Sequence, residues 1–93
     1  MGYEQTEHEL NVTLERDLNV LTGRYILRRA REVERVRIDC SGASLIDSEG
    51  VIVLYQLVKS GKAVTLHHPP AIFFEVVETL QLSDFFDMDA MVA

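Results

Sequence analysis

Hydrophobic and polar positions alternate along three short segments of the chain, and this period of two predicts β-strands. The segments are 10–14, 36–40 and 63–67. Residues that favour turns, Ser41-Gly42 and Pro69-Pro70, follow the second and third segments. We therefore expect three strands, and we expect Phe85-Phe86 to lead into a short last strand or a docked tail.

Apolar residues at helical spacing lie between the first two of these segments. Beyond Thr22-Gly23, one helical face carries Ile26, Ala30 and Val33. The opposite face carries four arginines, which are Arg24, Arg28, Arg31 and Arg35. This pattern predicts an amphipathic helix with a basic ridge. We interpret the ridge as a solvated face, with a contact to an acidic partner surface or to lipid head groups as the alternative.

The apolar run 51–58 begins with β-branched residues and by propensity alone is compatible with a buried strand. The flanking residues favour a helix instead. Asp47 or Ser48 offers an N-cap, and Glu49 places a negative charge in the first turn. At the other end, Lys59 and Lys62 supply positive charge and Gly61 is a C-terminal stop. We therefore predict a second helix here.

A third helix is expected after Pro69-Pro70, which supplies a proline for a first turn. Its apolar positions continue at helical spacing through Thr79, and they are Ile72, Phe73, Val76, Val77 and Leu80. Strands and helices in alternation predict an α/β fold with a small, mostly parallel sheet of about four strands and helices packed against it. We expect the 93 residues, 1–93, to form a single domain.

The composition limits the kinds of partner and the cellular compartment that we expect for this protein. The net charge of −6 disfavours nucleic acid, whose phosphates are bound through an excess of Lys and Arg. The acidic N-terminus does not have the pattern of a signal peptide, and no apolar run approaches the roughly 20 residues that span a bilayer. The single cysteine, Cys40, excludes an internal disulfide and is typical of a buried structural thiol. We expect a cytoplasmic protein with a protein or small-molecule partner.

The residues Asp47-Ser48-Glu49-Gly50 form the loop that starts the second predicted helix. A helix N-terminus presents unsatisfied backbone N–H groups and the positive end of the helix dipole, so an anion is favoured there. A phosphate group on Ser48 would therefore fit without a change of fold. The apolar side chains of Val51, Leu54 and Val58 follow, and they cannot all be buried if the neighbouring helix face already covers the sheet. The sequence thus predicts a docking patch with a charge switch beside it.

The segment 35–86 resembles the STAS domain, the fold of bacterial anti-sigma-factor antagonists, and the likeness covers about residues 10–86. A strand leads to the Asp-Ser-x-Gly element at 47–50, which is the most specific part, and an apolar helix, a strand and a proline-started helix follow. The resemblance implies that a partner kinase, itself the anti-sigma factor, phosphorylates Ser48 and that a phosphatase reverses the reaction. It also implies that Gly50 lets the helix start close to the partner. Glu49 stands where the family usually has a small residue.

Our leading hypothesis is a non-enzymatic bacterial regulator that switches partners when Ser48 is phosphorylated. The expected partner-binding residues are Asp47, Ser48, Glu49, Gly50, Val51, Leu54 and Val58. The alternative is a small STAS subunit that docks on an ABC-type ATPase of phospholipid transport through the same loop and helix. Under both hypotheses the protein is not an enzyme.

Three further observations exclude an enzyme in this interpretation. His67 and His68 would point to opposite faces of a strand with no third ligand nearby, so we expect no metal. Ser48 as a hydrolase nucleophile needs a base and an orienting acid, and nothing in the sequence places His8, His67 or His68 beside it. The aromatic residues are typical of core and edge positions, and we expect no cofactor.

Overall fold

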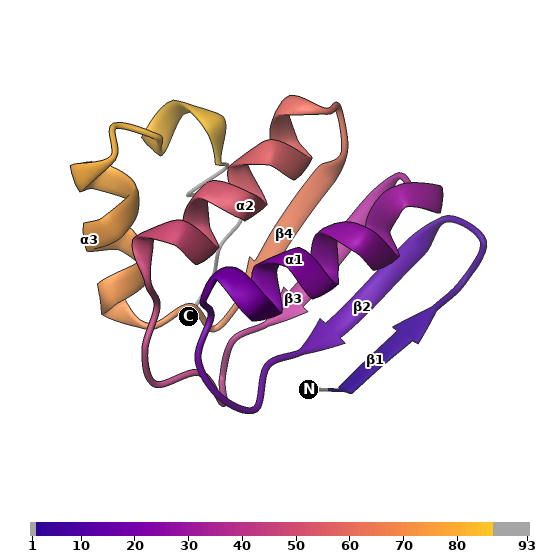
Figure 1. Cartoon of the computed structure of the whole chain (residues 1–93), viewed down its shortest axis with the longest axis horizontal. Helices are drawn as coiled ribbons and strands as arrows, with labels where there is room; N and C mark the ends of the chain where they lie inside the picture. Colours follow the sequence, from indigo (N-terminus) through magenta and orange to yellow (C-terminus); the bar gives the residue numbers. More distant parts are fainter. Residues whose placement is uncertain (1, 87–93) are drawn as a thin grey trace.

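The strands form one sheet in the computed structural model, which describes residues 2–86 (Figure 1). They are β1 (Gly2–Gln5), β2 (Glu9–Thr13), β3 (Arg35–Asp39) and β4 (Ala63–His67). The order in the sheet is β1-β2-β3-β4, with β1 antiparallel to β2 and both other pairs parallel. The predicted α/β class with a small, mostly parallel sheet is therefore confirmed.

Within residues 2–86, three helices alternate with the strands. They are α1 (Val20–Arg29), α2 (Ser48–Lys59) and α3 (Ala71–Thr79), and two short 3₁₀ turns, η1 (Ala30–Glu32) and η2 (Ser83–Phe85), follow α1 and α3. Figure 1 shows α1 and α2 lying across the same face of the sheet, with α3 beside α2. The other face carries polar side chains, among them Thr13, Arg37 and Asp39. Parallel neighbouring strands must be joined by a crossover connection. Here α1 connects β2 to β3 and α2 connects β3 to β4, so the helices form a layer against the sheet.

The core lies between the helices and the alternate apolar positions of the strands. Leu10 and Val12 of β2, Ile38 of β3 and Leu66 of β4 are buried, and each fully buried side chain of this size stabilises the fold by roughly 1.5–3 kcal/mol. The helices contribute buried residues at helical spacing, which include Ile26, Val51, Leu54, Leu57, Phe73 and Val77. The buried side chains, which recur every two residues in the strands and at a period of 3.6 in the helices, thus form one apolar layer.

The strand β1 was not predicted, because its residues do not alternate between apolar and polar. It is an edge strand held by its pairing with β2 and by Tyr3, whose ring meets the ring of Tyr25 in α1 edge to face at 6.3 Å. Tertiary contacts, rather than local pattern, therefore decide this element.

The first helix begins earlier and ends earlier than the sequence pattern predicted. Asn19 is its N-cap and forms a capping box with Thr22. The helix ends at Arg29, so the prediction that Arg35 continues the basic ridge is wrong. Arg35 is the first residue of β3, and its Nε lies 3.4 Å from Oε2 of Glu9 on the neighbouring strand.

The last described residues form η2 and Phe86, and the short strand or docked tail that we expected after Phe85-Phe86 lies outside the described residues. The ring of Phe85 packs on Tyr55 at 4.8 Å, and the ring of Phe86 packs on Phe73 at 5.8 Å. These contacts dock η2 and Phe86 on α2 and α3. Edge-to-face aromatic pairs contribute about 0.5–1.5 kcal/mol beyond the burial of their area.

Candidate functional site

The loop before α2 is capped by Asp47. Its Oδ1 atom accepts a hydrogen bond of 2.7 Å from the backbone N–H of Glu49, and its carbonyl accepts one of 3.2 Å from Val51. Ser48 is then the first residue of the helix. Its side chain is exposed, and its hydroxyl has no hydrogen-bond partner within residues 2–86. Of the two predicted caps, Asp47 fills the role and Ser48 remains free for other contacts.

This loop is fixed to the segment that precedes α1. The backbone N–H of Leu18 donates to the carbonyl of Leu45 at 3.0 Å, and the N–H of Asp47 donates to the carbonyl of Leu18 at 2.9 Å. The two segments form a parallel bridge between Leu18 and Ile46. The N-terminus of α2 is therefore held beside the N-terminus of α1, which gives Ser48 a defined place.

Gly50 is buried and faces this same segment. A Cβ atom at Gly50 would lie 2.9 Å from the carbonyl of Leu18 and 3.0 Å from the nitrogen of Asn19. The glycine is therefore required by packing inside the chain. The prediction that it brings the helix close to a partner is wrong, because its side of the helix is already covered.

The structure also corrects two of the predicted docking residues. Val51 and Leu54 are fully buried, while Val58 is half-buried and Ile52 is exposed. The prediction assumed that α2 contacts only the sheet, but α1 also packs closely on α2. A Cβ atom at Gly23 of α1 would lie 3.0 Å from Cβ of Val53. A helix with two packed faces buries more of its apolar residues than one sheet can cover.

Four apolar residues are exposed on the segments that meet at the start of α2. The exposed fractions are 73% for Leu21, 63% for Leu45, 39% for Ile52 and 37% for Ile72. Leu21 lies in the first turn of α1, Leu45 in the loop that is bonded to Leu18, and Ile52 one turn after Ser48. We call these four residues together with Ser48 the Ser48 surface. A leucine among turn-forming residues, as at Leu45, is the sequence signal that could have indicated it.

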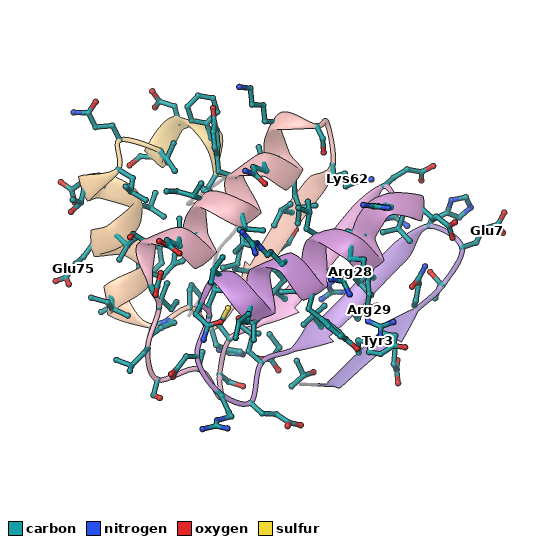
Figure 2. All side chains as sticks on the ribbon, in the orientation of Figure 1. Tyr3, Glu7, Arg28, Arg29, Lys62 and Glu75 are labelled. Carbon is teal, nitrogen blue, oxygen red and sulfur yellow. The ribbon has the colours of Figure 1, made fainter. Side chains whose placement is uncertain are left out.

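A shallow groove of about 250 Å³ lies between the start of α2 and α3. It is lined by Ser48, Ile72, Glu75, Val76, Thr79 and Leu80. Figure 2 shows Glu75 on the outer side of α3. The carboxylates of Asp47 and Glu49 flank Ser48 in the sequence and are also exposed, so the Ser48 surface is an apolar area with acidic residues at its margin.

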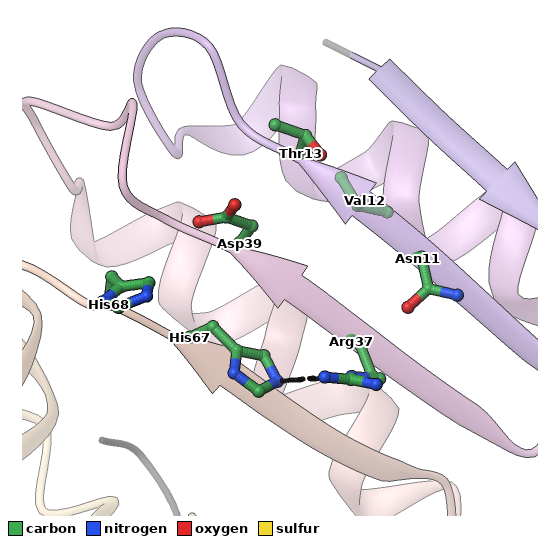
Figure 3. Close-up of a pocket in the computed structure, with 7 residues that line it drawn as sticks. All are labelled: Asn11, Val12, Thr13, Arg37, Asp39, His67 and His68. Atoms are coloured by element: carbon green, nitrogen blue, oxygen red, sulfur yellow. Dashed lines mark hydrogen bonds between the residues drawn. The ribbon is translucent and has the colours of Figure 1, made fainter. Parts of the chain in front are cut away.

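A second hollow, of about 350 Å³, lies on the face of the sheet opposite α1 and α2 (Figure 3). Arg37 donates to Nε2 of His67 at 3.0 Å, so this nitrogen acts as the acceptor. The backbone N–H of Ser41 donates to Asp39 at 3.0 Å, and this bond holds the pKa of the Asp39 carboxyl below its ordinary value. β4 ends at His67, and residues 2–86 contain no cluster of three metal-ligating side chains.

Cys40 lies at the end of β3 inside the core. Burial raises the pKa of its thiol from 9.0 to about 12. The thiolate is the nucleophilic form, so this residue is unreactive in the folded protein at neutral pH.

Comparisons with known proteins find likeness in structure but not in sequence. No protein-family model and no curated protein matches the chain. The solved structure of the anti-sigma factor antagonist SpoIIAA in its unphosphorylated form is similar, with a TM-score of 0.64 and 19% identity over 83% of this chain and 80% of that chain. The protein thus has a STAS-like fold. Within residues 2–86, no helix has the length and apolar character to cross a membrane.

Proposed function

We propose that this protein is a non-enzymatic regulatory module that binds a protein partner through the Ser48 surface and releases it when Ser48 is phosphorylated. The observation that carries the proposal is an exposed serine hydroxyl without a partner in residues 2–86, fixed at a helix N-terminus, with exposed apolar side chains on the neighbouring segments. The similarity to an anti-sigma factor antagonist supports a regulatory role for this fold. The partner would be a serine kinase that is also the anti-sigma factor, and a phosphatase would restore the free hydroxyl.

The apolar side chains would supply the binding energy. Leu45, Ile52 and Ile72 are exposed in the free protein, and a partner that covers them would remove their surfaces from water. The fixed loop supports this role, since a surface that is already ordered loses little conformational entropy on binding.

Phosphorylation would act through charge. A phosphate adds about −1.5 to −2 units of charge at Ser48. The carboxylates of Asp47, Glu49 and Glu75 already lie around this position. Covering the modified serine would then bury a strongly hydrated dianion beside an apolar contact, which costs free energy unless the partner supplies cations. The N-terminal amides of α2 would hold the phosphate without a change of fold.

Two structural observations support the view that Ser48 is not a catalytic nucleophile. Nucleophilic serine requires a hydrogen-bonded base, and the Ser48 hydroxyl has no partner in the described part of the chain. The histidines make other contacts: His8 lies 3.2 Å from Glu34, and His67 accepts from Arg37. We therefore assign Ser48 the role of substrate for a kinase.

The proposal is tested in two steps. Intact mass and peptide mapping of the protein purified from its own host should detect one phosphate on Ser48 in part of the population. The captured partner should then bind Ser48→Ala as it binds the unmodified chain, and bind Ser48→Asp and Ile52→Asp at least about tenfold more weakly, which corresponds to about 1.4 kcal/mol. Equal affinity for all four proteins would contradict the proposal.

Ser60→Asp is the matched control, because it adds the same charge at the exposed C-cap of α2. The two serines lie about 18 Å apart along the helix axis. If Ser60→Asp weakens binding as much as Ser48→Asp does, the effect is one of net charge and not of this surface. A population that is never phosphorylated, and a captured ABC-type ATPase for which Ser48 is required, would instead indicate the docking subunit of a transport complex.

A further inference from the structure

Arg29, at the end of α1, is held between two aromatic rings. The guanidinium carbon lies 4.0 Å from the centre of the Tyr3 ring and 4.3 Å from the centre of the Tyr25 ring. Cation–π contacts of this kind orient a guanidinium and cover its faces, so that hydrogen bonds must come from the N–H groups in its plane. Figure 2 shows Tyr3, Arg28 and Arg29 gathered beside the C-terminal half of α1.

One of these N–H groups is unsatisfied. The Nε atom of Arg29 is buried and has no hydrogen-bond partner within residues 2–86. A buried donor without a partner is uncommon in folded proteins, and its presence requires an explanation. A ligand oxygen that displaces a neighbouring side chain would supply the missing acceptor.

A hollow of about 320 Å³ adjoins this arginine. Its lining residues are Gln5, Tyr25, Arg28, Arg29, Arg31 and Glu32. Its volume is at the lower end of the range for small-molecule sites. Three guanidinium groups thus lie together with one amide and one carboxylate. The guanidinium groups can donate hydrogen bonds to an anion, and the amide and the carboxylate can bind hydroxyl groups.

The positive charge of this hollow is not neutralised by ion pairs. In the part of the chain that the structure describes, the arginines that contact a carboxylate are Arg35 and Arg37, both through Glu9. Arg28, Arg29 and Arg31 have no such contact, although acidic residues outnumber basic ones by 15 to 9 in the chain. Lys62 adds a further positive charge nearby, since its Nζ donates to the carbonyl of Arg31.

We propose that this hollow binds the phosphate group of a small phosphate ester. The planar N–H groups of Arg29 and the exposed side chains of Arg28 and Arg31 match the oxygens of a phosphate, which arginine binds in a bidentate manner. Gln5 and Glu32 lie where they can accept hydrogen bonds from hydroxyl groups of the ester. The aromatic clamp lowers the entropy lost by Arg29 on binding.

The site is separate from the Ser48 surface. α1 begins next to the Ser48 loop and ends at Arg29, and its ten residues span about 15 Å. A ligand at the far end of α1 leaves Ser48 exposed. This proposal therefore does not depend on the proposed function, and either can fail alone.

The test follows the Nε–H signals of the arginines in the ¹⁵N-labelled full chain by NMR. Glucose 6-phosphate should shift the Arg29 Nε–H signal with saturation below about 10 mM, inorganic phosphate should bind more weakly, and glucose should have no effect. Arg28→Gln should weaken binding about tenfold. Arg24→Gln, which removes the same charge from an exposed position of α1 outside the hollow, should change it less than about twofold.

Three results would overturn the proposal. The site is refuted if the Arg29 signal does not respond to the ester, or if chloride at the same ionic strength produces the same shift. The assignment to an ester is refuted if inorganic phosphate binds as tightly as glucose 6-phosphate. Arg28→Gln leaves the aromatic clamp of Arg29 in place, so a loss of binding in this variant is not a loss of fold.

Discussion

The α-carbon of Gly50 lies directly against the backbone of Leu18, so close that a methyl group on Gly50 would come within 2.9 Å of the Leu18 carbonyl. The carbonyl carbon and oxygen of Leu18 are backbone atoms and cannot rotate away. The glycine of the Asp-Ser-x-Gly element thus joins the start of α2 to the start of α1. The position of Ser48 depends on this close approach, since the hydrogen bonds of Leu18 hold the loop before it.

Gly50→Ala should therefore destabilise the protein. Alanine in a helix is favoured over glycine by about 1 kcal/mol, but overpacking against backbone that cannot rotate away should cost about 2–3 kcal/mol, the upper part of the usual range, so we expect a net loss of about 1–2 kcal/mol. Urea unfolding followed by circular dichroism measures it. Gly2→Ala is the control, because nothing lies within 4 Å of the Cβ it would add. A Gly50→Ala variant as stable as the Gly2→Ala variant would show that the two segments can move apart.

Two substitutions in α2 separate the core from the surface. Leu54→Ala should lower the free energy of unfolding by about 2–5 kcal/mol, because it leaves a cavity in the core. Ile52→Ala removes an exposed side chain two positions away and should cost less than about 1 kcal/mol. Chemical denaturation of both variants gives the comparison. Similar losses would mean that Ile52 is packed in solution and not available to a partner.

The capping role of Asp47 can be separated from its charge. Asp47→Ala removes the acceptor for the Glu49 N–H and should cost about 1 kcal/mol of stability. Asp47→Asn keeps an acceptor oxygen and should remain within about 0.5 kcal/mol of the original chain. Thermal unfolding of the two variants checks both values. If asparagine is as destabilising as alanine, the interaction of the negative charge with the helix dipole outweighs the hydrogen bond.

The buried thiol makes stability depend on alkaline pH. In the unfolded chain Cys40 ionises near its ordinary pKa of 9.0, whereas in the folded protein its pKa is raised to about 12. The unfolded state therefore loses its proton first, and stability falls as the pH rises from about 9 toward 12. Cys40→Ala should show a smaller decrease over this range. At neutral pH, iodoacetamide should modify the thiol of the original chain much faster in urea than in buffer, and equal rates would contradict its burial.

Much of the fold could be predicted because local pattern and packing agree. The strands β3 and β4 and the helix α3 match their predicted positions to within one or two residues. The choice of helix for the run beginning at Val51 depended on its flanking residues, and the structure has Asp47 as the N-cap, Ser60 as the C-cap and Gly61, with a φ of 94°, directly after it. The strand β1 had no such pattern, and it exists because β2 offers an unpaired edge and α1 offers the Tyr25 ring.

The candidate site was predicted less completely, for a physical reason. The position of Ser48 at a helix N-terminus follows from sequence, because capping residues act locally. Which face of α2 is exposed depends on where α1 packs, and contacts between distant segments leave no local pattern. Leu54 and Ile52 are both apolar and lie two positions apart, yet one is core and the other surface.

The polar face of the sheet in Figure 3 offers a place for a spectroscopic label. Thr13 is exposed there, on the side of the sheet away from α1 and α2. Because the chain contains a single cysteine and that thiol is buried, a Thr13→Cys variant would react with a maleimide dye at one site. The same attachment could fix the protein to a sensor surface in one orientation, with the helices and Ser48 directed toward the solution.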